Sequence, residues 1–517
     1  MTGQDSERAE PTVVGDSRST WRAGVGAHGE RSRPKRGVPP APEARAGAGH
    51  GWRAVAVVLV GAFMALLDTT IVTVALPSIR TGLHASPAAL EWVVSAYALA
   101  YGLALVPAGR AGDRFGHKPL FLVGLTIFVV ASAACGLAQN QGEIVAARII
   151  QGMGAGIFYP AISATIQLTF SGARRSKAFG ALGATIGGSI AVGPVLGGLI
   201  IAGAGTDHGW RWVFLVNVVI GAIALPMAAW QLPRSRSLIG RQFDPVGLCL
   251  LTAGLLLGLI PLVEGQQDGW PAWCGLSFGA AVIAFALLAW WEVRAERRGN
   301  DPLLKPSLLA ETSFTAGALF AVAFFAGFTS VLFTISLLWQ EGLARSALTT
   351  GLVVVPFSFA SLISAAISDK LSARMGRMVL VAGCTMVAVG IALAALVIHL
   401  AAPLPSNWDL VGPLLLAGLG SGMVVAPNQD FVLARVPENE AGTAGAILGT
   451  AQRVGSAIGI AVIGTVLFTN LQVQPGANAE AAAFSHSSQL ALLANVAFVV
   501  VALLLVIALP RQIPPRR

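Results

Sequence analysis

The ten residues Gly109-Arg-Ala-Gly-Asp-Arg-Phe-Gly-His-Lys118 separate two apolar runs, which cover approximately residues 90 to 109 and 119 to 138. A run of about 20 mostly apolar residues is long enough to cross a lipid bilayer as a helix. The segment between the runs is basic, and basic residues favour one side of a membrane. This stretch therefore predicts two membrane-spanning helices joined by a short turn.

The rest of the chain breaks into runs of the same kind at polar or Gly/Pro-rich boundaries, which gives fourteen predicted spans in all. In chain order they cover approximately 54–77, 90–109, 119–138, 143–169, 178–203, 211–231, 245–264, 273–293, 313–339, 348–368, 377–400, 410–431, 442–469 and 488–509.

Composition supports a membrane protein. Of the 517 residues, 55% are hydrophobic and 11% are charged, whereas soluble domains carry roughly 25% charged residues. The chain therefore cannot cover a water-facing surface, which excludes a cytosolic enzyme and a secreted protein. The four cysteines stand singly, so we expect no disulfide framework and no metal site. The fold class predicted is an all-α integral membrane protein with 14 transmembrane helices.

The basic residues fix the orientation. If the spans alternate in direction, 29 of the 34 Lys and Arg residues fall on the side of the N-terminal tail, three on the opposite side and two within spans. Because cytoplasmic loops are enriched in Lys and Arg, both termini are predicted to be cytoplasmic. This bias also explains the net charge of +9 without nucleic acid as a partner. Residues 1–52 are polar and lack apolar periodicity, which predicts a disordered basic cytoplasmic tail.

A weak internal repeat indicates two halves. Glycines alternate at residues 152–156 and again at 418–422, and Arg114-Phe-Gly116-His is similar to Arg374-Met-Gly376-Arg. Both matches pair one helix with the helix eight positions later, as expected if two helices are inserted between two six-helix halves. The predicted domains are an N-terminal half at 53–231, two inserted helices at 232–305, a C-terminal half at 306–510 and a cytoplasmic C-terminus at 511–517.

Three charged residues stand out inside the predicted spans: one acid, Asp68, and two bases, Arg148 and Arg453. A charged residue at the centre of a membrane-spanning helix costs free energy. Such residues therefore usually face a cavity and have a functional role. Asp68 lies roughly 13 Å and Arg148 roughly 8 Å from the same side of the membrane, at 1.5 Å per residue. Burial favours a neutral carboxyl group and a nearby guanidinium favours the charged form, so such a pair suits proton coupling. The alternative is a static pair that only fixes helix packing.

For Arg453 we favour the packing interpretation, and we expect Glu264, Glu341 and Asp430, at span ends, to be solvated.

Glycine and proline mark two further segments. In the turn at 109–118, Gly116 permits a left-handed conformation, Asp113 can cap a helix N-terminus, and Arg114 and Lys118 suit the cytoplasmic side. In the fifth span, glycines four residues apart allow close helix approach. Pro194 predicts a kink there.

These segments resemble the major facilitator superfamily, in particular its fourteen-helix drug/proton antiporters, from about residue 54 to 510. The first span, Leu67-Asp68-Thr-Thr-Ile-Val-Thr73-Val-Ala-Leu-Pro77, is similar to that family's helix-one motif, with Thr73 in place of the usual Asn. The stretch Arg148-Ile-Ile-Gln-Gly152 resembles its helix-four motif, and Trp210-Arg-Trp-Val-Phe-Leu-Val-Asn217 also fits.

The resemblance implies roles for two more groups of residues. A gating loop would comprise Gly109, Asp113, Arg114, Gly116 and Lys118. An antiporter motif would comprise Gly193, Pro194, Gly197 and Gly198, with Ser189 in place of an upstream glycine.

By resemblance, the chain is expected to export amphipathic drugs or antibiotics across the cytoplasmic membrane by alternating access, confer resistance, and act as a monomer. Asp68 would accept the proton and Arg148 would modulate it, with the proton gradient as energy source and no cofactor. No Lys follows a Gly, so a GxxxxGK[ST] loop for ATP is absent.

Three alternatives differ from this expectation: a proton-coupled uptake symporter for a small metabolite, a dedicated exporter of one secondary metabolite, and a membrane enzyme or sensor. No loop after residue 52 is long enough to form a catalytic domain, which disfavours an enzyme. Polar and aromatic residues within the spans form a search list for the substrate cavity: Tyr97, Gln151, Tyr159, Gln340, Asn428, Gln429 and Arg453.

Overall fold

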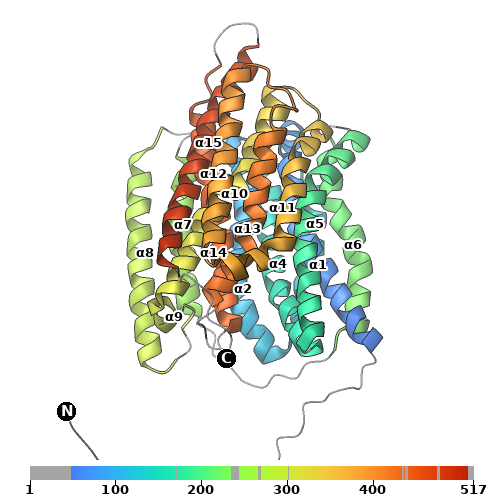
Figure 1. Ribbon diagram of the computed structural model, residues 1–517, viewed down its shortest axis with the longest axis vertical. Coiled ribbons are helices and arrows are strands. Elements are labelled where there is room, and N and C mark those ends of the chain that lie inside the picture. Colours follow the sequence, from blue (N-terminus) through green and yellow to red (C-terminus); the bar gives the residue numbers. More distant parts are fainter. Residues whose placement is uncertain are drawn as a thin grey trace, which may run out of the picture. The chain divides into compact units, whose positions relative to one another are not determined.

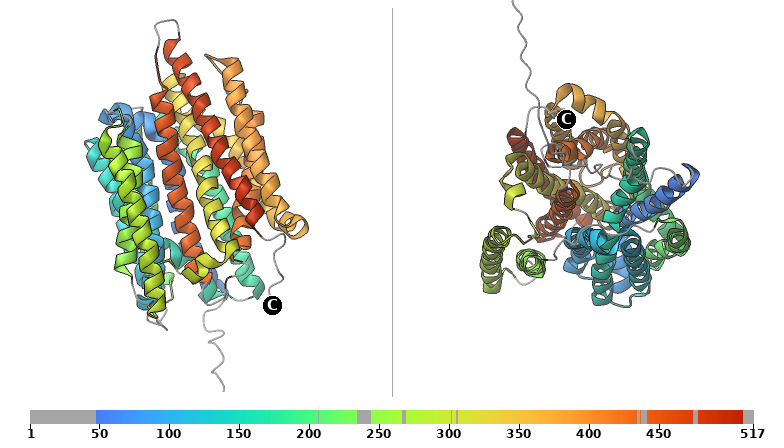
Figure 2. Two further views of the ribbon diagram at one scale, coloured as in Figure 1. Left: turned by 90° about the vertical axis from the view of Figure 1, so that its left-hand side faces the viewer. Right: turned by 90° about the horizontal axis from the view of Figure 1, so that it is seen from below.

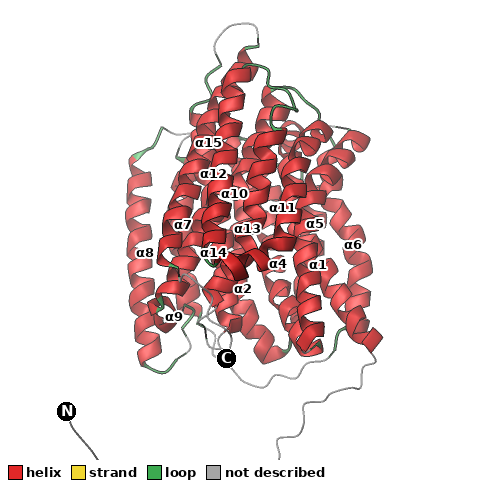
Figure 3. Cartoon of the chain, viewed as in Figure 1, coloured by secondary structure: helices red, strands yellow, loops and turns green. Residues whose placement is uncertain are grey.

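The computed structural model describes residues 48–170, 172–205, 207–233, 244–265, 269–300, 302–304, 306–433, 436, 441–473 and 478–509. Within these ranges every regular element is a helix (Figure 3). The long helices are α1 (Ala48–Leu83), α2 (Pro87–Phe115), α3 (His117–Leu137), α4 (Gln141–Thr169), α5 (Gly172–Ala204), α6 (Gly209–Gln231), α7 (Pro245–Glu264), α8 (Ala272–Arg297), α10 (Thr312–Leu337), α11 (Ala347–Met375), α12 (Met378–Ala401), α13 (Val411–Leu433), α14 (Ala441–Thr469) and α15 (Ala479–Leu505). The short elements are α9 (Pro306–Ala310), a π-helical turn η1 (Leu338–Gly342) and a 3₁₀ turn η2 (Val506–Ala508).

Among the described residues, thirteen helices are long and apolar enough to cross a membrane, and α5 makes a fourteenth if its two bent parts form one span. The prediction of fourteen spans agrees with this arrangement. Successive helices alternate in direction (Figure 1). We call the end of the bundle where α1 begins and α15 finishes the terminal end, and the opposite end the far end.

Helix α5 carries the kink that its sequence predicts. Its parts Lys177–Ser189 and Val192–Ala204 meet at 41°. Pro194 has no amide hydrogen, and its ring clashes with the carbonyl four residues earlier, at position 190. The bend therefore begins one turn before the proline.

The largest boundary difference from the sequence prediction is at the start of the last span, and α1, α2 and α11 also extend beyond their predicted ends. The last span was expected from residue 488, but α15 begins at Ala479. The added turns contain serines that are buried against the rest of the bundle, including Ser485 and Ser487. Tertiary packing lengthens this helix where hydropathy gives no signal.

The turn at Gly109–Lys118 is tighter than its length suggests. Helix α2 continues to Phe115 and α3 begins at His117, so Gly116 alone reverses the chain, at φ 94°. The left-handed conformation expected at Gly116 is confirmed. The Lys118 ammonium then donates to the carbonyls of Ala229 (2.6 Å) and Leu232 (2.9 Å) and thereby caps the C-terminus of α6.

An equivalent turn joins α11 and α12. Gly376 has φ 57°, and Arg377 donates to the carbonyls of Ile507 (2.7 Å), in η2, and Leu509 (2.9 Å), just after it, where the chain leaves α15. Near each glycine turn, one basic residue thus donates hydrogen bonds to the C-terminal end of the last helix in its six-helix set: Lys118 to that of α6, and Arg377 to that of α15. This structural repeat pairs helices in the same way as the sequence repeat.

Glycine contacts repeat as well. A Cβ at Gly152 of α4 would clash with the carbonyl of Tyr97 on α2. In the same way, a Cβ at Gly418 of α13 would clash with the carbonyl of Phe357 on α11, so the helices of the two pairs approach each other equally closely. The residue boundaries of the two halves stay a prediction.

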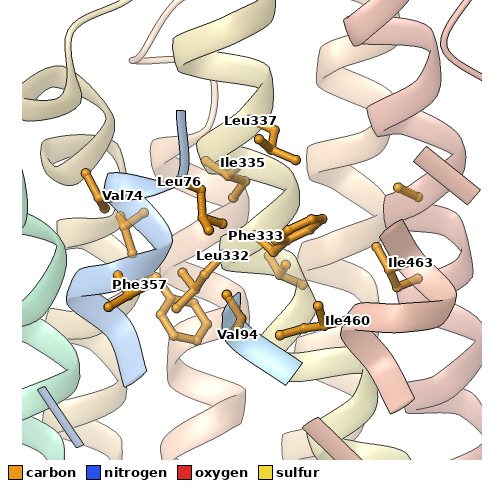
Figure 4. Close-up of a cluster of buried hydrophobic side chains, with 14 of the residues drawn as sticks. Val74, Leu76, Val94, Leu332, Phe333, Ile335, Leu337, Phe357, Ile460 and Ile463 are labelled. Carbon is orange, nitrogen blue, oxygen red and sulfur yellow. The ribbon is translucent and has the colours of Figure 1, made fainter. Parts of the chain in front are cut away.

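The hydrophobic core is shared at the far end and divided at the terminal end. One cluster joins far-end residues of α1, α2 and α4 to α10, α11 and α14. Figure 4 labels side chains of this cluster from α1 (Val74), α2 (Val94) and α10 (Leu332 and Phe333). Toward the terminal end, a second cluster contains only residues of α1–α6 and of the chain just after α4 and α6, and a third combines α2, α10, α13 and α14 with residues 303–308. Toward the terminal end, α2 therefore still shares a cluster with α10, α13 and α14, whereas α1 and α4 share one with the second helix set at the far end.

Helices α7 and α8 stand at one side of the bundle, opposite α5, α6 and α11 (Figure 1 and Figure 2). They pack on each other, and α7 also contacts α2 and α14. The inserted pair is thus attached where two helices of different sets meet.

Candidate functional site

Asp68 is the centre of a buried polar cluster. It lies on α1 with no exposed surface. Its Oδ1 accepts hydrogen bonds from Gln151 Nε2 (2.9 Å) and Asn217 Nδ2 (2.9 Å). Its Oδ2 forms an ion pair with the Arg148 guanidinium. The proximity of Asp68 and Arg148 inferred from helix rise is thereby confirmed.

Arg148 has further partners besides Asp68. Its Nε donates to the carbonyl of Val93 (2.7 Å), and its Nη1 donates to Gln151 Oε1 (2.8 Å). The guanidinium carbon lies 4.0 Å from the centre of the Tyr97 ring, which adds a cation–π interaction. These three contacts do not involve Asp68, so Arg148 is held in place by neutral groups as well as by the carboxylate.

Ser132 on α3 links the donors. Its hydroxyl oxygen accepts from Gln151 (3.1 Å) and Asn217 (3.2 Å), and the hydroxyl donates to the carbonyl of Phe214 (2.9 Å). Buried polar groups of this kind hold one another's rotamers through their hydrogen bonds. The cluster therefore draws on α1, α2, α3, α4 and α6, and its members are fully buried.

No sequence pattern marks Ser132, and Asn217 is marked only as the last residue of the segment at 210–217 that fits the family resemblance. One signal could have found Asn217, because an amide within an otherwise apolar helix needs a hydrogen-bond partner when buried.

The glycines of the antiporter motif join α5 to two different helices. A Cβ at Gly193 would clash with Thr70, and one at Gly197 would lie 3.0 Å from the carbonyl of Ile71 on α1. A Cβ at Gly198 would lie 2.6 Å from Leu348 Cα on α11. Helix α5 thus contacts α1 within three residues of Asp68. One residue after Gly197, it contacts α11, which belongs to the second set of six helices.

The gating-loop residues are placed at the terminal end of α2. Gly109 is open, since a Cβ there meets nothing within 4 Å. Arg114 is exposed and lies over the ring of Phe115 (5.3 Å). The side chain of Asp113 lies outside the described part of the structure.

Part of the substrate search list forms an aromatic strip. Tyr97 and Tyr101 meet edge to face at 5.9 Å, and Tyr101 meets Tyr159 at 5.7 Å. Arg453, on α14, lies over the Tyr101 ring at 4.2 Å. Its contact therefore crosses between the two helix sets, about midway along α2.

The remaining members of the list lie elsewhere. Gln151 belongs to the Asp68 cluster. On α13, Asn428 is buried and Gln429 is exposed. Gln340 lies at the far end, where its amide donates to the carbonyl of Val74 (2.9 Å). The structure does not gather these residues into one site.

Gln340 belongs to a set of contacts that close the far end. Ser336 donates to the carbonyl of Thr73 (2.6 Å), and Arg80 forms an ion pair with Glu341. All of these contacts join α1 to α10 or η1. Together with the shared core, they correspond to a conformation closed at the far end.

Three expectations about acids need correction. Glu91 and Glu292, which the sequence analysis overlooked, lie within membrane-spanning helices and are buried. Glu341 is paired with Arg80 rather than solvated, and Glu264 accepts from Trp92 Nε1 (2.9 Å). The Asp430 side chain lies outside the described residues. Glu264 and Glu341 stand at helix ends, where Trp92 and Arg80 of neighbouring helices take the place of water.

The family model of the Major Facilitator Superfamily matches residues 58–460. A protein named "Probable actinorhodin transporter" from Streptomyces coelicolor is 34% identical over 441 residues, which is 85% of this chain and 76% of that protein. The "Puromycin resistance protein" of Streptomyces alboniger is 34% identical over 430 residues, 80% of this chain and 81% of its own.

A third relative, the "Tetracenomycin C resistance and export protein" of Streptomyces glaucescens, is 31% identical over 424 residues, 81% of this chain and 76% of its own. Among solved structures, the xylose transporter of E. coli, in a partially occluded inward-open conformation, matches with a TM-score of 0.60 at 14% identity. That match covers 88% of this chain and 97% of the other.

Proposed function

This chain belongs to the Major Facilitator Superfamily, and from that premise we propose that it exports amphipathic drugs or antibiotics in exchange for protons. It is a multi-pass membrane transporter, and the family's fold works by alternating access. Export, rather than uptake, is supported by the relatives, whose names state resistance or export. The proposed setting is the cytoplasmic membrane, with both termini in the cytoplasm and the protein acting as a monomer.

The observation that carries the proposal is the buried Asp68 cluster. A carboxylate shielded from water and held by a guanidinium and two amides is a group whose charge depends on its partners. Movement of α4 or α6 relative to α1 would change those partners and the occupancy of the proton. In this proposal, Asp68 accepts the proton and Arg148 modulates its binding.

The proposed energy source is the proton gradient, without ATP or a bound cofactor. One elementary charge that crosses 100 mV releases about 2.3 kcal/mol. Together with a pH difference, this suffices for a useful concentration ratio of an amphipathic compound.

The test uses purified protein in liposomes that have an imposed proton gradient. Wild type is expected to release protons when an antibiotic or an amphipathic dye is added, and Asp68→Asn is expected to abolish that release. Glu143→Gln is the matched control, because Glu143 is an exposed acid on α4. Proton release that survives Asp68→Asn would exclude Asp68 as the acceptor. A response to only one compound would identify a dedicated exporter.

A further inference from the structure

Arg453 is a cation near the midpoint of the membrane-spanning helix α14. Among the described residues it forms no ion pair, whereas Arg148 is paired with Asp68. A charge at this depth is costly and usually belongs to a pathway or a binding site. The described part of the structure therefore leaves the positive charge of Arg453 without a matching anion.

Contacts between α14 and α2 fix the direction of this side chain. The two helices form a seam between the two six-helix sets. A Cβ at Gly102 of α2 would lie 2.8 Å from the Cβ of Arg453, and Thr450 donates to the carbonyl of Gly102 (2.7 Å). The guanidinium carbon then lies 4.2 Å from the centre of the Tyr101 ring. Arg453, which belongs to the second helix set, thus places its charge on the first.

Helix α7 covers the lipid-facing side of the same seam. Leu255 of α7 packs with Ala98 of α2 and Ala461 of α14 in one buried cluster, and Val454 packs against that cluster. Successive residues of an α-helix point about 100° apart. Because Val454 is turned toward α7, Arg453 is turned away from the lipid side of the seam and toward the interior of the bundle.

Two tyrosines complete the surroundings of Arg453. The Tyr101 side chain is fully buried, and its hydroxyl has no hydrogen-bond partner, although the charge of Arg453 acts on it. Tyr159 of α4 meets Tyr101 edge to face at 5.7 Å and is also within reach of that charge. The hydroxyl of Tyr97, by contrast, donates to the carbonyl of Ala65 (2.9 Å). Since buried hydroxyls are normally hydrogen-bonded, the Tyr101 hydroxyl indicates a missing acceptor.

An aromatic anion fits these three side chains. A guanidinium offers its donors in a planar fork that matches a carboxylate, and the Tyr101 hydroxyl can donate to one of the same oxygens. Arg453 and Tyr159 are half-buried, so a ligand can reach both. Aromatic rings pack favourably on a tyrosine ring. Because the far end is closed, the ligand would arrive from the terminal end.

We propose that Arg453, Tyr101 and Tyr159 bind the negatively charged aromatic group of the exported substrate. The proposal rests on the export function above and adds the chemical class of the substrate. Arg453 pairs with the anionic oxygens, the Tyr101 hydroxyl donates to one of them, and Tyr159 packs on the ring. Uncharged and cationic compounds of the same shape bind more weakly, because they leave the guanidinium unpaired or repel it.

This site adjoins the proposed proton site and does not share its acid. Tyr101 meets Tyr97 edge to face at 5.9 Å, and the guanidinium carbon of Arg148 lies 4.0 Å from the centre of the Tyr97 ring. Two tyrosine rings thus stand between Arg453 and Arg148. A substitution at Arg453 should therefore change substrate affinity and leave the proton acceptor Asp68 in place.

The experiment uses the full-length protein in lipid nanodiscs and three fluorescent probes that share one ring system: pyrenecarboxylate, pyrenemethanol and pyrenemethylammonium. At neutral pH they are an anion, an uncharged alcohol and a cation. Dissociation constants are corrected for partition into empty nanodiscs. Wild type is expected to bind the carboxylate at least about tenfold more tightly than the alcohol, a difference of about 1.4 kcal/mol, and to bind the ammonium most weakly.

Three variants locate the preference. Arg453→Gln should bind the carboxylate no more tightly than the alcohol. Arg345→Gln is the matched control, since it removes the same charge from an exposed position before α11, and it should bind all three probes like wild type. Tyr101→Phe removes one hydroxyl only, and it should weaken carboxylate binding about fivefold without changing the affinity for the alcohol.

The outcomes separate this proposal from the export function. Equal affinity for carboxylate and alcohol in wild type would overturn the site, and so would a preference that survives Arg453→Gln. If thermal unfolding shows that Arg453→Gln does not fold, Tyr101→Phe decides, and unchanged carboxylate affinity there would overturn the site. Selective binding of the carboxylate without its proton-driven export from liposomes would contradict the export function and leave the site standing.

Discussion

Asp68 and Arg148 interact where neither side chain reaches water. Removing one partner from a buried pair leaves an uncompensated charge, and this costs about 3–5 kcal/mol. We therefore predict that Arg148→Ala lowers the free energy of unfolding by about 3–5 kcal/mol, measured by denaturation in detergent. The double variant Asp68→Asn with Arg148→Ala should recover more than half of that loss. Equal loss in the single and double variants would show that the charge of Asp68 is not the source.

Asn217 provides a sharper test of coupling. Its amide donates to Asp68 and to Ser132, and hydrogen bonds to charged groups contribute about 1.5–3 kcal/mol. Asn217→Ala should reduce both thermal stability and substrate-dependent proton release. Asn495 of α15 is equally buried and accepts from Ser330, so Asn495→Ala should reduce stability and leave proton release intact. If both variants release protons like wild type, Asn217 has only a structural role.

The depth of Asp68 and Arg148 was predictable from sequence, because helix rise fixes how far a residue lies along its span. Their other partners were not. Whether Gln151 and Asn217 point at Asp68 or at lipid depends on the rotation of each helix about its axis, which residue counting does not give. For the same reason the sequence could not show that Tyr97, a member of the search list for the substrate cavity, lies under Arg148.

At the scale of the helices, the fit of α4 against α2 depends on glycine. A Cβ at Gly152 would clash with the main chain of α2, and overpacking of this kind costs about 1–3 kcal/mol. Gly152→Ala is therefore expected to destabilise the protein by that amount. Gly180→Ala, at an open helical position, should stabilise it by about 0.4–1 kcal/mol through the unfolded chain. Changes of the same sign in the two variants, measured by thermal unfolding, would contradict this account.

The helices themselves were largely predictable. Most spans begin and end within a few residues of the positions that hydropathy indicates, and the bend of α5 follows from Pro194. The exception is the start of α15, where buried serines and alanines form extra turns. A hydropathy pattern records preference for lipid, and these residues are buried in protein instead.

For the whole molecule, the contacts at the far end set the balance between conformations. The Arg80 side chain is 38% exposed in its pair with Glu341, and exposed pairs contribute about 0.2–1 kcal/mol. Glu341→Gln should therefore raise the population that is open at the far end by at most about fivefold. Spin labels at Thr81 and Leu404, with the exposed Cys249 replaced by Ser, would report it as a longer distance. Glu143→Gln serves as the control, and a shift of the same size there would show that the ion pair is not responsible.

The sequence predicted the two six-helix sets and the inserted pair, but it could not indicate which end is closed. The sequence around Ser336 and Gln340 is the same whichever end of the bundle is closed. Only the contacts of these side chains with Thr73 and Val74 show that the far end is closed. The position of α7 over one seam is likewise a matter of packing between distant segments.

The Asp68 cluster draws every partner described above from helices α1, α2, α3, α4 and α6. Evolution can therefore exchange or rapidly alter the C-terminal set without disturbing the part of the gene that encodes these contacts. A recombinant gene that keeps the N-terminal helices of one parent and takes the C-terminal helices of another would inherit all of these contacts unchanged.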